Sequence, residues 1–186
     1  MLTSGSSPAA AARRAAELVG VLTGPDAATD SRTLADLVSA VLAEHGEPDI
    51  GELTSADVDD LRAAAAELRR VFEAAAVDEA AETLNVLLRR HAGPPRLTRH
   101  GDTGWHLHID ADDDGPWGTW LITSSAWALS VLLADQQRLP VGICAAPTCS
   151  TPYVDVGHGT GRQYCSTRCA TRVRVATHRK RTATDS

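Results

Sequence analysis

The sequence predicts a mainly α-helical fold of the α+β class, built in two parts. A helical N-terminal domain with a small β-hairpin is expected over residues 1–140, and a small C-terminal module that ends in a basic helix over residues 141–186. Three observations predict this. Apolar residues recur at helical spacing in five segments, one short segment alternates with a period of two, and all four cysteines lie in the last quarter of the chain. With 186 residues, 43% of them hydrophobic, the chain can bury one core and a small satellite.

Four amphipathic helices are predicted before residue 93, each from an apolar stripe at spacings of three and four. Ser7 would cap the first, which has Pro8 at its first position and runs to about Leu22. Ser31 would cap the second, and Gly46 would end it. The third starts at Thr54 or Ser55, and the fourth covers about 78–91. Stripes of this kind are usually packing surfaces, so these helices should form the core.

A strand and a long helix should complete the N-terminal domain. Trp105, Leu107 and Ile109 alternate with polar residues, which predicts a strand whose apolar face is buried. Its expected partner is residues 96–100, joined through the turn at 101–104. The helix expected over 117–137 holds three of the four tryptophans and should be the spine of the domain.

Enzymatic chemistry is weakly supported, so we expect this protein not to be an enzyme. His106, His108 and Asp110 share one strand face and could hold a catalytic metal, but that face is expected to be solvated and no helical His-Glu pair supplies further ligands. The acidic run 112–114 lacks the alternating ligands of a calcium loop. The hydroxyl run 123–125 has no histidine or acid at a spacing that would indicate a catalytic nucleophile, and the sequence contains no phosphate-binding loop motif.

The four cysteines form two pairs, Cys144 with Cys149 and Cys165 with Cys169, which have four and three intervening residues. This spacing is typical of a structural Zn²⁺ ion held by four thiolates. The second pair should lie on the opening turn of the last helix, which describes a treble-clef-like zinc module. The alternatives are disulfides or unrelated buried thiols, and His158 is expected to be a spectator.

Charge is divided sharply between the two parts. Residues 1–137 hold ten Lys or Arg and twenty-two Asp or Glu, whereas residues 138–186 hold eight and two. A polyanion should therefore be repelled by the first part and attracted only by the second. Between Arg162 and Arg181 there are seven basic residues and no acidic one. On a helix, Cys165, Cys169, Val173 and Ala176 would form an inward stripe, with basic residues over the opposite arc.

Double-stranded DNA is the partner that this basic helix favours. RNA is less favoured because the module offers only Tyr153 and Tyr164 for base stacking. A solvated tail and a zinc-stapled protein–protein interaction module without DNA binding are the alternatives. The expected DNA contacts are Arg168, Arg172, Arg174, Arg179, Lys180 and Arg181.

The expected compartment is the cytoplasm, where thiols remain free to bind metal. The segment 1–20 is interrupted by Arg13, Arg14 and Glu17 and lacks the apolar run of a signal peptide or anchor. No transmembrane run is expected, and no membrane partner.

The chain resembles the CGNR zinc-finger proteins of bacteria, regarded as stress-induced transcription regulators with a helical N-terminal domain called ABATE. The resemblance covers most of the chain. It rests on Cys144, Cys149, the Tyr153–Asp155 stretch, QYCSTRCATRVRVATHRKR, ETLNVLL and GTWLITSSAWALSVLL. Where the family has Gly-Asn-Arg after its last cysteine, this chain has Ala170, Thr171 and Arg172. Arg172 alone is kept, and it is our expected base reader.

The resemblance and the residues together predict a DNA-binding transcription regulator. Its N-terminal domain should either sense a small-molecule effector or form a homodimer, in both cases through the tryptophan-rich helix at 117–137.

Overall fold

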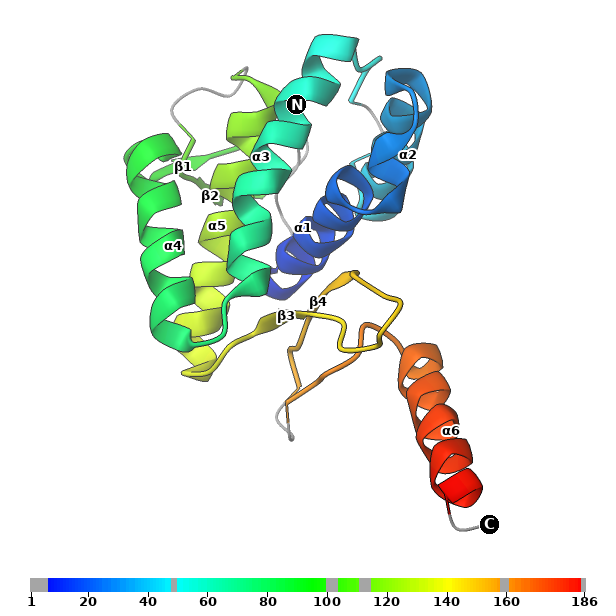
Figure 1. Ribbon diagram of the computed structural model, residues 1–186. Coiled ribbons are helices and arrows are strands. Elements are labelled where there is room, and N and C mark those ends of the chain that lie inside the picture. The colour runs from blue at the N-terminus through cyan, green and yellow to red at the C-terminus, as the bar shows by residue number, and fades with distance from the viewer. Residues whose placement is uncertain (1–6, 48–49, 100–103, 111–114, 158–160, 185–186) are drawn as a thin grey trace.

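The computed structural model describes residues 7–47, 50–99, 104–110, 115–157 and 161–184 (Figure 1). It confirms the mainly helical fold, with two small hairpins, a cluster of four cysteines and a final helix. The helices are α1 (Pro8–Thr23), η1 (Pro25–Ala28), α2 (Ser31–Glu44), α3 (Ser55–Glu73), α4 (Val77–His91), α5 (Trp117–Gln136) and α6 (Thr167–Thr184). The antiparallel strands are β1 (Arg96–Thr98) with β2 (His106–His108), and β3 (Val141–Ile143) with β4 (Pro152–Val154).

Side-chain caps fix the starts of α1 and α2. The Ser7 hydroxyl accepts a hydrogen bond from the amide of Ala10 at 3.3 Å, as expected for the cap of α1. The predicted cap of α2 is wrong by one residue. Asp30 and not Ser31 receives the first amides, those of Arg32 and Thr33, each at 3.1 Å. The negative charge of the aspartate carboxylate also interacts favourably with the positive end of the helix dipole, which an uncharged serine hydroxyl does not.

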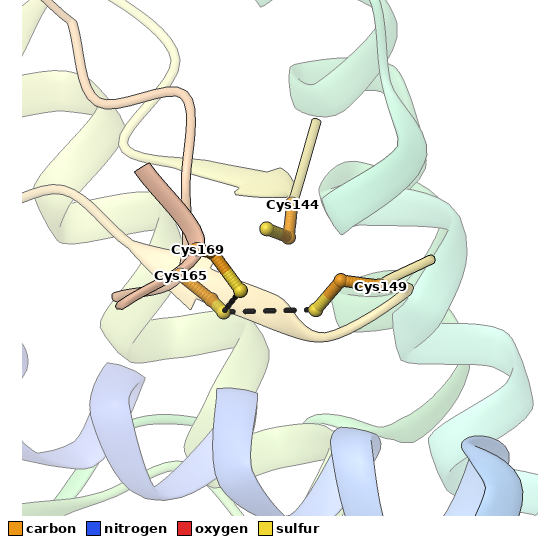
Figure 2. A group of neighbouring side chains, drawn as sticks. All are labelled: Cys144, Cys149, Cys165 and Cys169. Atoms are coloured by element: carbon orange, nitrogen blue, oxygen red, sulfur yellow. Dashed lines mark hydrogen bonds between the residues drawn. The ribbon is translucent and has the colours of Figure 1, made fainter. Parts of the chain in front are cut away.

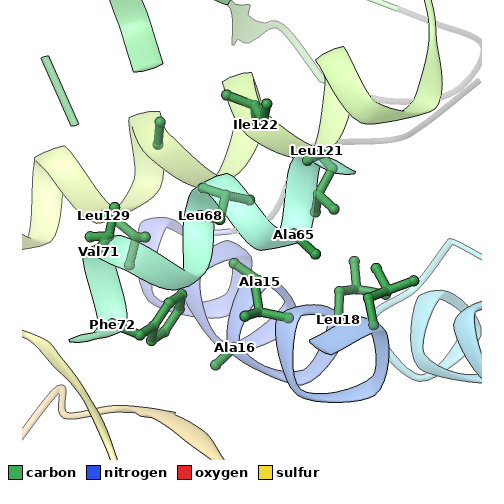
Figure 3. Close-up of a cluster of buried hydrophobic side chains, with 14 of the residues drawn as sticks. Ala15, Ala16, Leu18, Ala65, Leu68, Val71, Phe72, Leu121, Ile122 and Leu129 are labelled. Atoms are coloured by element: carbon green, nitrogen blue, oxygen red, sulfur yellow. The ribbon is translucent and has the colours of Figure 1, made fainter. Parts of the chain in front are cut away.

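Helix α5 lies at the centre of the helical domain and packs against α1, α3 and α4. Figure 3 shows its buried side chains beside those of α1 and α3. Leu121 and Leu129 are fully buried there. Its start is fixed on α3, because the Gly118 amide donates to the Asp60 carboxylate at 2.6 Å. A Cβ at Gly118 would lie 2.6 Å from that carboxylate, so only glycine allows this approach. By length and composition α5 could also cross a bilayer, but more than half of its apolar window is buried inside this domain, as in the core helix of a globular fold.

Around β2 the first hairpin presents the opposite face to the core from the one predicted, although Ile109, just after the strand, is buried as expected. Trp105 is 68% exposed and Leu107 40%, whereas His106 is buried and His108 half-buried. His106 Nδ1 is hydrogen-bonded to the Gly104 carbonyl, and His108 Nδ1 to the Asp110 carboxylate. Because these polar nitrogens keep hydrogen-bond partners, the histidine face can turn inward. Residues 101–103 of the predicted turn and the acidic run 112–114 lie outside the described residues.

The second hairpin joins the helical domain to the cysteine module. Val141 of β3 and Val154 of β4 are buried in the main core, where β3 packs on α3 and β4 packs on α1 (Figure 1). The segment that carries the first cysteine pair therefore starts from a rigid base. A boundary at residue 140 remains a prediction, since residues beyond it also contribute to the helical core.

Candidate metal centre and basic helix

The four cysteine side chains converge at the end of the second hairpin (Figure 2). Their sulfurs all lie within 4.8 Å of one another, and Cys165 Sγ lies 3.7 Å from both Cys149 Sγ and Cys169 Sγ. All four are free thiols, since disulfide sulfurs would be about 2.0 Å apart. Sulfurs at 2.3 Å from one tetrahedral Zn²⁺ ion would be separated by about 3.8 Å. The donor set and its spacing therefore fit one structural zinc ion.

Backbone hydrogen bonds hold the first pair in place. The Cys144 amide, directly after β3, donates to the Thr151 carbonyl at 3.0 Å. The Cys149 amide donates to the Ala146 carbonyl at 2.9 Å, which closes a tight turn between Cys144 and Cys149. Ala145 donates to Gln163 at 2.9 Å and so connects this turn to the segment that carries the second pair.

The second pair is split between a turn and a helix. Cys169 lies in the first turn of α6, where its amide donates to the Ser166 hydroxyl at 3.3 Å. Cys165 precedes the helix by two residues, so only one of the two cysteines lies on the opening turn that was predicted for both.

Arg162 is an internal support of the module. Its side chain donates to the carbonyls of Tyr164, at 2.6 Å, and of Cys165, and its guanidinium carbon lies 5.5 Å from the centre of the Tyr153 ring. The Tyr153 hydroxyl in turn donates to the Arg162 carbonyl. One of the seven basic residues counted in the sequence is therefore occupied inside the module. The sequence placed it in a charged run but carried no signal for this role. His158 lies outside the described residues.

The surroundings of the four cysteines stabilise the thiolate form of Cys149 but not that of Cys165. Hydrogen bonds from the hydroxyl and amide of Thr151 lower the pKa of Cys149 to about 6, whereas burial raises the pKa of Cys165 to about 12. Arg172 adds one further donor, with its Nη2 3.4 Å from Cys169 Sγ. A divalent cation at the centre would supply the missing charge compensation, because a coordinating thiol is deprotonated.

A substitution at Gly142 tests whether Tyr153 and Arg162 support the cysteine module. A Cβ there would lie 2.6 Å from the Tyr153 hydroxyl oxygen, and Tyr153 is held by Arg162 on its other side. We expect Gly142→Ala to displace the ring, to destabilise the module by about 1–3 kcal/mol and to speed zinc transfer to a chelator. Gly161→Ala is the control, because a Cβ at Gly161 meets nothing within 4 Å. Equal transfer rates for the two variants would contradict the supporting role of Tyr153.

Helix α6 projects away from the rest of the protein (Figure 1). Val173 packs against the cysteine cluster, but Ala176, predicted on the same inward stripe, is exposed and lines a shallow groove of about 260 Å³ beside Pro147 and Thr148. The groove also touches Arg172 and Lys180. The six predicted DNA contacts are all exposed. Among the contacts of the described residues, Arg172 is the one of the six that reaches a cysteine, Cys169, and Lys180 lies beside the groove.

Part of the chain matches a known protein family. Residues 141–182, which hold all four cysteines and most of α6, match the family described as the CGNR zinc finger. No curated protein matches the chain.

Proposed function

We propose that this protein, whose residues 141–182 form a CGNR zinc finger, is a DNA-binding transcription regulator that contacts the DNA backbone through α6. One observation carries the proposal. An 18-residue helix with six Lys or Arg and no acidic residue carries Cys169 in its first turn and extends into solvent. The zinc ion fixes the start of the helix, so the arginines are ordered before they meet phosphate and the entropy cost of binding is lower.

The exposed part of α6 supports a polyanionic partner. From Arg174 to Arg181 every side chain is exposed, so packing within the chain contributes little to this stretch. Arg168 lies four residues from Arg172, and like charges at this spacing destabilise a helix by a few tenths of a kcal/mol. A phosphate backbone would offset this repulsion. The acidic helical domain would be held away from the same backbone, which leaves α6 as the approaching surface.

Salt dependence tests the proposal. About four to six neutralised phosphates should give a slope of roughly −4 to −5 for log affinity against log salt. Arg174→Ala and Arg179→Ala should each flatten the slope by about one unit, because each removes one phosphate contact. Arg89→Ala, an exposed arginine of α4, should leave the slope unchanged.

Arg172 requires a separate measurement. It is our proposed base reader, and its replacement by alanine should relax sequence preference by about 1–3 kcal/mol. Its guanidinium also donates to Cys169 Sγ, so zinc content must be measured on the same sample. If zinc-loaded protein shows no salt-dependent affinity for duplex DNA at about 50 mM salt, the regulator proposal fails.

A zinc-stapled interaction module is the second candidate. The groove between the first cysteine turn and α6 is lined by Pro147, Val173 and Ala176, which offer an apolar floor for a peptide. This candidate predicts no dependence on DNA and takes the place of the regulator if the salt experiment fails. In either case we assign the N-terminal domain to effector sensing or homodimerisation, and the protein to the cytoplasm.

A further inference from the structure

The helical domain contains a cavity of about 310 Å³ between α1, α5 and the first hairpin. Trp120 and Trp127 of α5 and Arg14 of α1 form parts of its wall, and His106 and His108 line it from β2. The side chain of His108 is 10% exposed and that of Asp110 15%. A metal was not expected at this strand face because the face was expected to be solvated. In the structure the face is largely buried, so that reason does not apply.

The two histidines direct the same ring nitrogen toward each other. His106 Nε2 lies 3.0 Å from His108 Nε2, with ring centroids 4.9 Å apart. Two lone pairs at this distance repel, so either a proton or a metal ion must lie between them. Imidazole nitrogens bound at about 2.0–2.1 Å to one metal are separated by about 2.9 Å at a right angle and about 3.3 Å at the tetrahedral angle. The observed distance falls within this interval.

The other nitrogen of each ring is held by an oxygen acceptor. His106 Nδ1 lies 2.9 Å from the Gly104 carbonyl, and His108 Nδ1 lies 3.0 Å from Asp110 Oδ1. Arg96 Nη2 donates to the same carboxylate oxygen at 3.0 Å and fixes its position. A backbone carbonyl and a carboxylate are the usual partners of metal-binding histidines, because they leave the Nε2 lone pair free for the ion and set the ring orientation.

The geometry points to a metal site on His106 and His108, which takes a divalent first-row ion of the kind that imidazole favours, Zn²⁺, Ni²⁺ or Cu²⁺. Both histidines line the cavity, which gives water or a small anionic ligand access to such an ion. Ser124 Oγ, on the cavity wall, has no hydrogen-bond partner among the described residues and can bond to such a ligand. This site lies in a different part of the chain from the four cysteines and does not depend on DNA binding.

Equilibrium dialysis of tag-free, full-length, zinc-loaded protein against Ni²⁺ tests the site. We expect about one bound Ni²⁺ per chain while the one zinc ion of the cysteine centre is retained. His106→Gln and His108→Gln should each lose this Ni²⁺, because one imidazole cannot hold it. Asp110→Asn keeps both imidazoles and should weaken binding by about 10–100-fold, the usual effect of changing the partner of a metal-binding histidine. His178→Gln, on exposed α6, should bind Ni²⁺ as the unchanged protein does.

Thermal unfolding followed by tryptophan fluorescence gives a second readout. Ni²⁺ should raise the midpoint of the helical domain in the unchanged protein and in His178→Gln, but not in His106→Gln, since a ligand of the folded state alone stabilises it. If a histidine variant does not fold, the graded loss in Asp110→Asn still decides. No bound Ni²⁺, or binding that His106→Gln and Asp110→Asn both leave unchanged, would overturn the site and leave a proton shared by the two rings.

Discussion

Replacing Cys169 by serine is expected to abolish zinc binding and to unfold the cysteine module, while the helical domain stays folded. Among the described residues of the module the buried core is Cys144, Ala146 and Cys169, which is too small to hold this structure by apolar packing. Structural zinc supplies about 10–16 kcal/mol of apparent binding free energy in small zinc modules. Loss of one of four ligands should therefore exceed the effect of any single arginine replacement on α6.

Different probes separate the two parts of the protein in this experiment. All four tryptophans lie between residues 105 and 127, so their fluorescence reports on the helical domain alone. Amide NMR signals of residues 144–151 and 161–181 report on the module, and elemental analysis should fall from about one zinc per chain to none. Ser150→Ala, an exposed neighbour of the cysteines, is the matched control. A metal-free Cys169→Ser protein with dispersed module signals would contradict the structural role of zinc.

The elements that could be predicted from the sequence are those fixed by local spacing. The start of α3 and both ends of α4, two helices with apolar stripes, were predicted to within one residue. The cysteine cluster was predictable because short intervals between thiols leave few geometries other than a shared ion. The final helix was also predicted, though it begins at Thr167, two residues after the first cysteine of the second pair.

The error at the first hairpin arose where packing between elements decides the outcome. The alternation around His106 shows which residues share a face, but not which face turns inward. The inward choice depends on oxygen acceptors at Gly104 and Asp110 and on a cavity formed by α1 and α5. No spacing rule within the strand contains that information.

Arg14 is the clearest case of a long-range partner. In the sequence it is one of three charges that interrupt an apolar segment, whereas in the structure its side chain is 1% exposed and forms an ion pair with Glu47, 33 residues away. Its guanidinium carbon also lies 4.7 Å from the centre of the Trp120 ring. Burial raises the pKa of Glu47 and lowers that of Arg14, and the attraction between the two charges opposes both shifts.

Arg14→Met should destabilise the helical domain by about 3–5 kcal/mol near neutral pH, because it leaves the Glu47 carboxylate buried without its cation. Methionine keeps an apolar stem against Trp120, so the loss reports mainly on the charge. Urea unfolding of zinc-loaded protein, followed by tryptophan fluorescence, measures the change in the free energy of unfolding.

The double variant Arg14→Met/Glu47→Leu and the pH dependence then separate charge from packing. Replacement of both partners of a buried ion pair is often neutral or stabilising by about 1–4 kcal/mol, so the double variant should recover most of the loss.

In Arg14→Met the pKa of Glu47 should rise further, because the cation that opposed the effect of burial is gone. A carboxyl whose pKa is higher in the folded than in the unfolded state favours folding at low pH, and this contribution disappears as the pH rises through the folded-state pKa. Arg14→Met should therefore be closest to the unchanged protein near pH 5 and should lose stability toward pH 8, whereas the double variant should show no such trend. If the single variant loses the same free energy at both pH values, the cost comes from altered packing and not from an unpaired carboxylate.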